Sequence, residues 1–270
     1  MITELTFGPH STLERLQDLK GNEVLLCLIP IIPNKNTSAE AEVTALLKAE
    51  GKALVGNSAM SEGDKSGGGK AQIIIISEDR YRNNLELYLA RLNAVLGHFK
   101  SLFARNCMVK RITPSLAKDF LAKHHSLGYC AAGTFYGMFI ERPGTSGQVK
   151  GEMVAVASFS KPRHWLKNSE QYNSYEFVRY ASLPSLRIAG GMGKMLEAFK
   201  KDHPNACDIM SYCDLEWSEG DAYRKLGFRE EAATPPQTFK IDMTSWERLR
   251  CKPEGTTYTN LGSKKYRLSL

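Results

Sequence analysis

The residues from Arg187 to Lys194, RIAGGMGK, form the segment whose spacing most clearly indicates chemistry. They follow a predicted strand at 175–181 and a proline break, and they lead into a predicted helix that extends to about Lys201. A glycine-rich turn at a helix N-terminus directs several backbone N–H groups to one place, and the helix dipole adds about half a positive charge there. The segment is therefore predicted to bind phosphate.

Three classes of phosphate site use a glycine turn of this kind. A dinucleotide-binding fingerprint requires a third glycine, but Leu196 occupies that position. A nucleotide-binding P-loop requires Ser or Thr after Gly-Lys, but Met195 follows Lys194. The remaining class is the site for the pyrophosphate arm of coenzyme A. The alternative is a plain helix N-terminus whose glycines only permit tight packing.

A second informative segment lies downstream of the glycine turn. Residues 208–214 are predicted to form a buried strand. Residues 217–228 follow as a short predicted helix, with Ser218 as its N-cap, Tyr223 within it and Gly227 as its stop.

In this order, the two segments together resemble the hallmarks of the GNAT (Gcn5-related) N-acyltransferases. That family's loop reads Q/R-x-x-G-x-G/A after a strand and before a helix. Here a Met stands at 192, so the glycines at 191 and 193 fit better and the arginine stands one place too early. The resemblance covers about residues 107–242 and implies acetyl-CoA or another acyl-CoA as cofactor. The implied cofactor-binding residues are Ala181, Leu183, Arg187, Gly190, Gly191, Met192, Gly193 and Lys194.

The resemblance also implies catalytic roles. Acyl transfer to an amine needs a base, donors to the thioester oxygen and an acid for the thiolate. Tyr223 has the place of the family's acid, and backbone N–H groups near residues 181–183 have the place of the oxygen donors. Glu176 is the expected base, and Asp214, at the end of the next strand, faces the same cleft or caps the following helix. Packing of Tyr223 in a core and a structural Glu176–Arg179 or Glu176–tyrosine contact are the alternatives.

Strand alternation makes a specific prediction about this region. Glu176 and Arg179 are three residues apart, so a regular strand places them on opposite faces, with Val178 and Tyr180 on the face of Glu176. His124, after the first helix of the resembling region, is a further candidate base. His125 follows directly and no third ligand can be identified, so no metal is expected.

A narrower resemblance points to phage-type GNAT relatives, which include the Mom proteins that modify adenine in DNA. The matching positions are His124, Glu176, Arg179, Asp214, Trp217, Ser218 and Tyr223. It implies that a nucleic-acid base, flipped out of its stack, is the acceptor. A predicted surface loop containing Lys161, Arg163 and Trp165 would then hold phosphates and stack a base.

The composition is that of a globular protein. The 270 residues are 42% apolar and 24% charged, and no apolar run reaches the length of a membrane span. The N-terminus has no signal-peptide pattern, and the six cysteines lack metal-site spacing. We therefore expect a cytoplasmic protein with reduced thiols. The net charge of +7 lies entirely in residues 106–270, which suits an anionic cofactor or a nucleic acid.

We predict an α/β (α+β) protein with two regions. Residues 1–105 form an accessory α/β region, with strands near 24–32 and 71–77, a helix at 38–51, a flexible loop at 58–70 and one long helix from Ser77 to about Ala104. Residues 106–270 form a GNAT-like domain, with a mixed, mostly antiparallel sheet flanked by helices. In that family the strands at 175–181 and 208–214 part to admit the acyl-pantetheine arm.

The predicted function is acyl-CoA-dependent N-acyl transfer to an amine, which DNA or RNA could carry. The first alternative is a nucleic-acid-binding protein that has kept the fold without the catalysis. The second is an N-acetyltransferase for small molecules or peptides. The acyl group, the acceptor and the oligomeric state stay open at this point.

Overall fold

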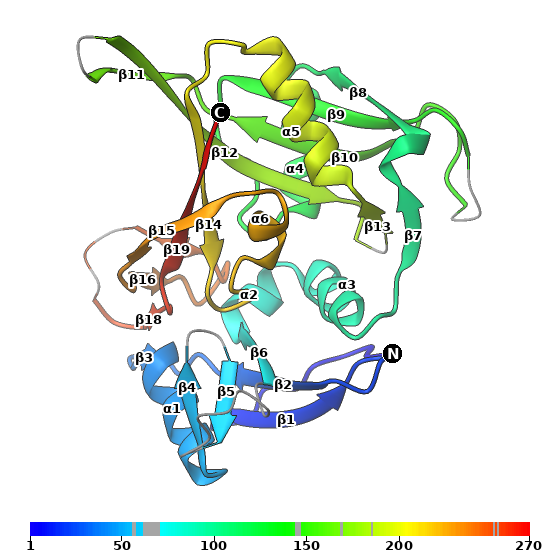
Figure 1. Cartoon of the computed structure of the whole chain (residues 1–270). Helices are drawn as coiled ribbons and strands as arrows, with labels where there is room; N and C mark the ends of the chain where they lie inside the picture. Colours follow the sequence, from blue (N-terminus) through cyan, green and yellow to red (C-terminus); the bar gives the residue numbers. More distant parts are fainter. Residues whose placement is uncertain are drawn as a thin grey trace. The chain divides into compact units, whose positions relative to one another are not determined.

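The computed structural model describes residues 1–55, 58–61, 71–143, 147–167, 170–184, 186–250, 252 and 254–270. The chain forms two compact units (Figure 1). The first unit comprises Met1–Gly97, Cys213–Asp221 and Ala232–Lys265, and the second comprises His98–Tyr212, Ala222–Glu231 and Tyr266–Leu270. The sequence predicts two consecutive regions that meet at residue 105, and this division of the chain stays a prediction. The chain passes repeatedly between the two units, which are described separately below.

A five-stranded sheet forms the centre of the first unit. Its order is β1-β2-β6-β5-β4, with β1 at Thr12–Gln17, β2 at Glu23–Ile29, β4 at Lys52–Val55, β5 at Ser58–Ser61 and β6 at Ala71–Ser77. The strands β2 and β6 run parallel, and their Leu and Ile side chains are buried on both faces. Helix α1, Ala39–Ala49, begins where the Ser38 hydroxyl accepts from the Ala41 N–H. These strands and this helix confirm the predictions for 24–32, 71–77 and 38–51.

Two predictions for this unit are wrong. The single helix expected from Ser77 to about Ala104 is two helices, α2 at Glu78–Asn83 and α3 at Leu85–Val95, followed by strand β7 at Lys100–Phe103. The break lies at Asn84, which leaves the helical conformation so that its side chain can cap α3 by accepting from the Leu87 N–H. The expected loop at 58–70 begins instead with β5, and residues 62–70 lie outside the described part of the chain.

The first unit contains a second sheet of four short strands. Its order is β17-β16-β18-β3, with β3 at Asn36–Ser38, β16 at Thr238–Ile241, β17 at Arg248–Leu249 and β18 at Thr257–Thr259. Apart from β16, these strands are two or three residues long. Because β3 and β18 pair in parallel, the C-terminal part of the chain is built into the N-terminal unit.

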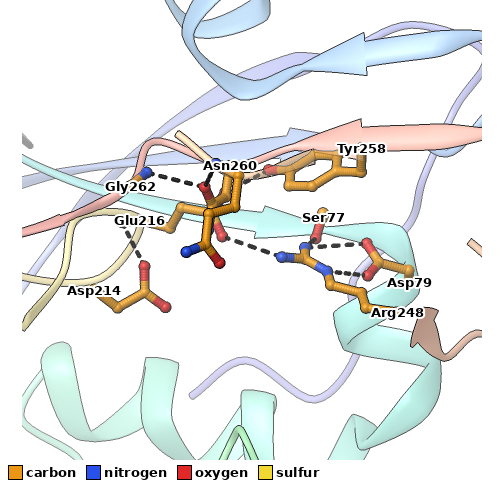
Figure 2. Close-up of polar contacts among 9 residues, drawn as sticks. Ser77, Asp79, Asp214, Glu216, Arg248, Tyr258, Asn260 and Gly262 are labelled. Atoms are coloured by element: carbon orange, nitrogen blue, oxygen red, sulfur yellow. Dashed lines mark hydrogen bonds and ion pairs between the residues drawn. The ribbon is translucent and has the colours of Figure 1, made fainter. Parts of the chain in front are cut away.

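A buried ionic cluster connects distant segments of the first unit (Figure 2). Arg248 donates to Asp79 at 2.6 Å and to the Ser77 hydroxyl at 2.8 Å. Tyr258 donates to Glu216 at 2.8 Å, and a guanidinium nitrogen of Arg248 lies 4.0 Å from the other oxygen of that carboxylate. Asp79 and Glu216 are both buried, so each depends on these partners for its charge to be compensated.

An eight-stranded sheet forms the centre of the second unit. Its order is β15-β19-β14-β12-β10-β9-β8, and β11 pairs with β12 beside that path. The strands are β8 at Cys107–Arg111, β9 at Thr134–Ile140, β10 at Met153–Phe159, β11 at Arg163–Lys167, β12 at Glu170–Ser182, β14 at Asp208–Asp214, β15 at Arg229–Thr234 and β19 at Ser263–Ser269. The chain of β14, β15 and β19 continues from this unit into the first one.

Two helices cover opposite faces of this sheet. Helix α4, Pro114–His124, packs Ala117 and Leu121 against Val156 and Ala181. Helix α5, Gly191–Asp202, packs Phe199 on the other face, against the rings of Tyr136, Phe159 and Tyr175. The pairs β8–β9, β9–β10 and β10–β12 are antiparallel, and β12 with β14 is parallel. The predicted mixed, mostly antiparallel sheet flanked by helices is confirmed, with additional sheets beside it.

Smaller features complete the second unit. A 3-10 turn, η1 at Ala104–Asn106, joins β7 to β8, and β7 pairs in parallel with β13 at Leu186–Ala189. Helix α6 spans Asp221–Lys225. Residues 163–165 lie on strand β11, so the surface loop expected there is wrong for these positions.

Among the described residues, no helix combines the length and the apolar character that crossing a membrane requires. The five cysteines in the described part of the chain are free thiols, and Cys251 lies outside that part.

Candidate functional site

The strands β12 and β14 pair along only part of their length. Their parallel register joins Ser174 to Asp208 and ends where Glu176 pairs with Met210. Beyond this point the Ser211 hydroxyl donates to the Phe177 carbonyl at 2.8 Å, so a side-chain hydrogen bond joins the two strands there. The separation of these two strands is the one that the GNAT resemblance implies.

A β-bulge lies at the same point of β12. Phe177 pairs with Phe159 and Arg179 pairs with Ser158, so Val178 is an extra residue without a partner in β10. A bulge leaves the backbone groups of its extra residue outside the ladder. The N–H of Val178 is therefore a candidate donor to a ligand between β12 and β14.

The bulge reverses the side-chain alternation along β12. Phe177 lies on the α5 face, because its ring stacks on Phe159. Arg179 lies on the α4 face, where its Nε donates to the Gly128 carbonyl at 3.4 Å. Glu176 precedes Phe177 in regular strand geometry and therefore also lies on the α4 face. The prediction that Glu176 and Arg179 face opposite sides is wrong, because the extra residue between them shifts the period by one.

Tyr180 is correspondingly on the other face from Glu176. Its hydroxyl lies beside Gly191 at the start of α5. The prediction that Glu176 and Tyr180 share a face is therefore wrong for the same reason. Ala181, the next residue, is buried against α4.

The N-terminus of α5 has the geometry predicted for the glycine turn. Gly190 is the N-cap and has a φ of 76°, a left-handed conformation that favours glycine. The Lys194 N–H donates to the Gly190 carbonyl at 3.0 Å, which is the first hydrogen bond of the helical ladder. The N–H groups of Gly191, Met192 and Gly193 therefore precede the intrahelical ladder, and they point along the helix axis toward a potential anion.

Two of these glycines also permit close packing. A Cβ atom at Gly191 would lie 2.5 Å from the Tyr180 hydroxyl, and one at Gly193 would lie 3.1 Å from a methyl group of Leu226. The packing alternative for the glycines is thus partly right. The contact with Leu226 also brings the glycine turn next to the segment that contains Tyr223.

The cationic side chains near the turn have other partners. The Lys194 ammonium donates to the Ala104 carbonyl at 3.0 Å and also to that of Cys107. Arg187 lies on β13, is exposed, and holds its guanidinium 5.0 Å above the Phe99 ring. Of these two expected cofactor ligands, only Arg187 has its charge turned to solvent.

The backbone at Leu183 is also engaged. Its N–H donates to the Val154 carbonyl at 3.0 Å, and its carbonyl accepts from the Leu186 N–H. The Leu183 N–H is therefore already paired and is not a free donor of the kind expected within 181–183, whereas the bulge at Val178 was not revealed by the sequence.

Tyr223 lies at the separation of β12 and β14. Its hydroxyl oxygen is 2.8 Å from the Ser211 oxygen and 3.3 Å from the Tyr212 carbonyl. The ring stacks on Tyr266 at a centroid distance of 5.4 Å. Tyr223 is therefore partly a packing residue, as in the alternative interpretation, and its hydroxyl lies where β12 and β14 stop pairing. Ser211 was not predicted, although a hydroxyl inside the apolar strand DIMSYCD is a signal for it.

The helix around Tyr223 begins later than predicted. Helix α6 starts at Asp221, and the Ser218 hydroxyl accepts from the Gly220 N–H at 3.0 Å. Ser218 therefore shapes the turn before the helix instead of capping it. Gly227, with a φ of 86°, ends the segment as expected.

Glu176 has a cationic neighbour that was not expected. An Arg163 guanidinium nitrogen lies 3.7 Å from its carboxylate, and its own N–H donates to the Ser160 hydroxyl at 2.9 Å. The Arg163 side chain is 62% exposed, so this pair is open to solvent. Arg179 instead uses its guanidinium on the carbonyls of Gly128 and Val178.

His124 ends helix α4 and packs edge-on against Phe120, with ring centroids 4.6 Å apart. Burial, and next the charge of Lys123, lower the pKa of His124, so its neutral form is favoured. Its Nδ1 atom is buried and has no hydrogen-bond partner within the described part of the chain. Within that part, no cluster of three or more His, Cys, Asp or Glu side chains is arranged to hold a metal ion.

The remaining predicted residues have local structural roles or exposed positions. Asp214 belongs to the first unit, where its carboxylate accepts from the Glu216 N–H at 3.0 Å (Figure 2) and its carbonyl accepts from the N–H groups of Trp217 and Ser218. It therefore caps the turn after β14. Lys161 is exposed, and the side chain of Trp165 lies outside the described part of the structure.

Comparison with known proteins finds solved structures that resemble this chain at low sequence identity. No protein-family model matches the chain, and no curated protein matches it. Among solved structures, NAA60 of Arabidopsis thaliana in complex with acetyl-CoA is 9% identical, with 61% of this chain and 99% of that chain covered, at a TM-score of 0.39. A Bacillus subtilis acetyltransferase in complex with CoA is 18% identical, with 61% and 98% covered, at 0.36. The NatC complex bound to Gag peptide and CoA is 12% identical, with 61% and 99% covered, at 0.36. At such scores the likenesses carry no conclusion, and the function has to be argued from the chain's own residues.

Proposed function

We propose that this chain is an acyl-CoA-dependent N-acyltransferase of GNAT type. The observation that carries the proposal is the position of the Tyr223 hydroxyl, held by Ser211 where β12 and β14 stop pairing. The glycine turn at the start of α5 lies next to this segment through the Gly193–Leu226 contact. An anion site and a proton donor thus flank a separation between two strands, which is the arrangement that an acylated pantetheine arm requires.

Each part of the site has a role in this proposal. The N–H groups of Gly191, Met192 and Gly193 bind the pyrophosphate. The Val178 N–H donates to the thioester oxygen, whose negative charge grows as the amine nitrogen attacks the carbonyl carbon. As the C–S bond breaks, the Tyr223 hydroxyl gives its proton to the departing thiolate. The amine proton passes to Glu176, directly or through water.

Calorimetry with acetyl-CoA tests the cofactor. We expect saturable binding to the full chain, and binding at least tenfold weaker in Gly193→Asp, which places a carboxylate against the pyrophosphate. Gly8→Asp is the matched control, because a Cβ at Gly8 meets nothing within 4 Å. Absence of binding in a folded wild-type protein would refute the proposal, as would equal affinities in the two variants.

A nucleic-acid base is the acceptor that we propose to test first. The basic side chains of Lys161 and Arg163 are exposed beside the start of β11, and Arg163 lies against the proposed base Glu176. Cations in this position would hold a phosphate backbone near the reacting centre. The Mom-like role stays a prediction, and so do transfer to a small molecule or peptide and nucleic-acid binding without catalysis.

The acceptor is identified by mass spectrometry after incubation with acetyl-CoA. DNA and RNA are digested to nucleosides, while a polyamine and a lysine peptide are analysed intact. A nucleoside that gains one acetyl group supports the base acceptor. Acetylation confined to the polyamine or the peptide would overturn it and leave the acyltransferase proposal standing. Salt-sensitive nucleic-acid binding without any acetylated product would favour the non-catalytic alternative.

A further inference from the structure

A surface pocket of about 490 Å³ lies in the first unit, and none of its lining residues belongs to the proposed acyl-transfer site. Three of its lining residues are aromatic, namely Phe7, Tyr81 and Trp246. Pockets of this volume commonly hold small molecules, and aromatic walls favour planar rings. The three aromatic residues come from distant parts of the chain, so no local sequence pattern marks this pocket.

The aromatic rings are fixed by contacts within the unit. Phe7 packs on Tyr81 with ring centroids 5.5 Å apart. The Arg82 guanidinium lies 4.7 Å above the Trp246 ring, and Trp246 is half-buried against the core below α1. The walls are therefore preorganised, so a ligand would not have to order them.

The backbone of Trp246 is held in an unfavourable conformation. Its φ of 60° is rare for a bulky residue. Asp242 maintains it, because its carbonyl accepts from the Trp246 N–H at 2.7 Å and its carboxylate accepts from the Thr244 and Ser245 N–H groups. Strain that the surrounding structure maintains is concentrated at ligand-binding positions.

Two polar groups of the pocket keep unused donors. The buried Tyr81 hydroxyl accepts from the Leu5 N–H at 3.0 Å, and no acceptor for its own proton is found within the described residues. Arg82 donates through Nε to Glu78 at 2.7 Å. Its two terminal nitrogens have no acceptor within the same part of the chain, so they can bind an anion.

We propose that this pocket binds a nucleotide. The base lies against the aromatic walls, the Tyr81 hydroxyl donates to an acceptor on the edge of the base, and the phosphate pairs with the terminal nitrogens of Arg82. Glu4, which also lines the pocket, can accept from a sugar hydroxyl. A free mononucleotide and one nucleotide of a single strand share this chemistry. The proposal is independent of the acyl-transfer activity.

Calorimetry with the full chain tests the pocket, using AMP, adenosine, inorganic phosphate and a short single-stranded oligo(dA) as probes. We expect Trp246→Gly, which relieves the strain but deletes the ring, to weaken AMP binding about tenfold. Asn34→Gly is the matched control, because Asn34 is the other non-glycine residue with positive φ within the described part. Arg82→Gln should weaken AMP several-fold and leave adenosine unchanged.

The probes distinguish the two sources of the nucleotide. Trp246-dependent binding of AMP identifies a free nucleotide, whereas Trp246-dependent binding of the oligonucleotide alone identifies a single strand. The proposal is overturned if neither binds the folded wild-type protein, if inorganic phosphate binds as tightly as AMP, or if Asn34→Gly loses as much affinity as Trp246→Gly.

Discussion

The hydroxyl of Ser211 is the central contact of the candidate site. It has one proton and lies 2.8 Å both from the Phe177 carbonyl oxygen and from the Tyr223 hydroxyl oxygen. The serine therefore donates to one of these two oxygens at a time, while the Tyr223 hydroxyl donates to the Tyr212 carbonyl at 3.3 Å. The Ser211 side chain thus contacts both a backbone carbonyl of β12, where the pairing with β14 ends, and the hydroxyl of Tyr223, the proposed acid.

Tyr223→Phe tests that acid. The ring packing on Tyr266 and Phe228 is kept, but no proton is available for the thiolate, so we expect turnover to fall at least tenfold with little change in acetyl-CoA affinity. Rates of free-thiol release and calorimetry measure the two quantities. Tyr212→Phe is the control, because Tyr212 is exposed and its backbone carbonyl, which the substitution keeps, accepts from the Tyr223 hydroxyl. Wild-type turnover in Tyr223→Phe would remove the assigned role.

Glu176→Gln tests the base. We expect a loss of about a hundredfold in turnover near neutral pH, because the amide cannot take the ammonium proton. With the polyamine or the lysine peptide as acceptor, the loss should shrink as the pH approaches the pKa of the amine, since the amine then loses its proton without help. Initial rates over a pH series measure this, with exposed Glu141→Gln as the control. A loss that does not change with pH would point to a structural role for the Glu176–Arg163 pair.

The bulge at Val178 shows what can be learned from sequence at the scale of single elements. The strand, the glycine turn and the helix after it could be predicted, because each has a local signal in periodicity and turn residues. The bulge could not, because it depends on the register between β12 and β10. One unpredicted residue therefore placed Glu176 and Arg179 on the same face, where opposite faces were predicted, although the strand itself was right.

Gly191→Ala tests how closely α5 packs on β12. The added methyl group would lie 2.5 Å from the Tyr180 hydroxyl and 3.0 Å from Ile188 Cβ, so we expect a loss of about 1–3 kcal/mol in the free energy of unfolding. Removing the hydroxyl in Gly191→Ala/Tyr180→Phe should recover part of it. Urea unfolding measures the series, and Gly193→Ala, which meets only the end of the Leu226 side chain at 3.1 Å, is the control. A double variant no more stable than Gly191→Ala would show that the clash lies elsewhere.

At the scale of the whole molecule, the order of the units along the chain was the least predictable feature. Local patterns correctly indicated β2, β6 and α1 in the first unit. They gave no sign that residues 213–221 and 232–265 complete it. The contacts that do so are long-range: β18 pairs in parallel with β3, and Arg248 pairs with Asp79. These contacts join single charged residues and very short strands. Neither produces a hydrophobic periodicity from which the contact could be predicted.

The buried cluster of Figure 2 makes the assembly of the first unit sensitive to pH. Burial raises the pKa of Glu216 to about 7, against an ordinary value of 4.5, although the Arg248 charge opposes the shift. A carboxyl whose pKa is raised on folding binds its proton more tightly in the native state. Its contribution to stability is therefore complete below about pH 4.5 and is lost as the pH rises through 7.

Glu216→Gln removes this titration while it keeps the length of the side chain. When the pH rises from 5 to 8, the free energy of unfolding of the wild type should fall by on the order of 2 kcal/mol relative to that of Glu216→Gln. The reason is that only the wild type releases a buried proton over that range. Urea unfolding at both pH values, followed through the fluorescence of the neighbouring Trp217, gives the difference. Glu14→Gln, an exposed carboxylate of the same unit, should follow the wild type at both pH values. If the stabilities of Glu216→Gln and the wild type change in parallel with pH, the cluster takes up no proton near neutrality, and Arg248 holds Glu216 ionised throughout.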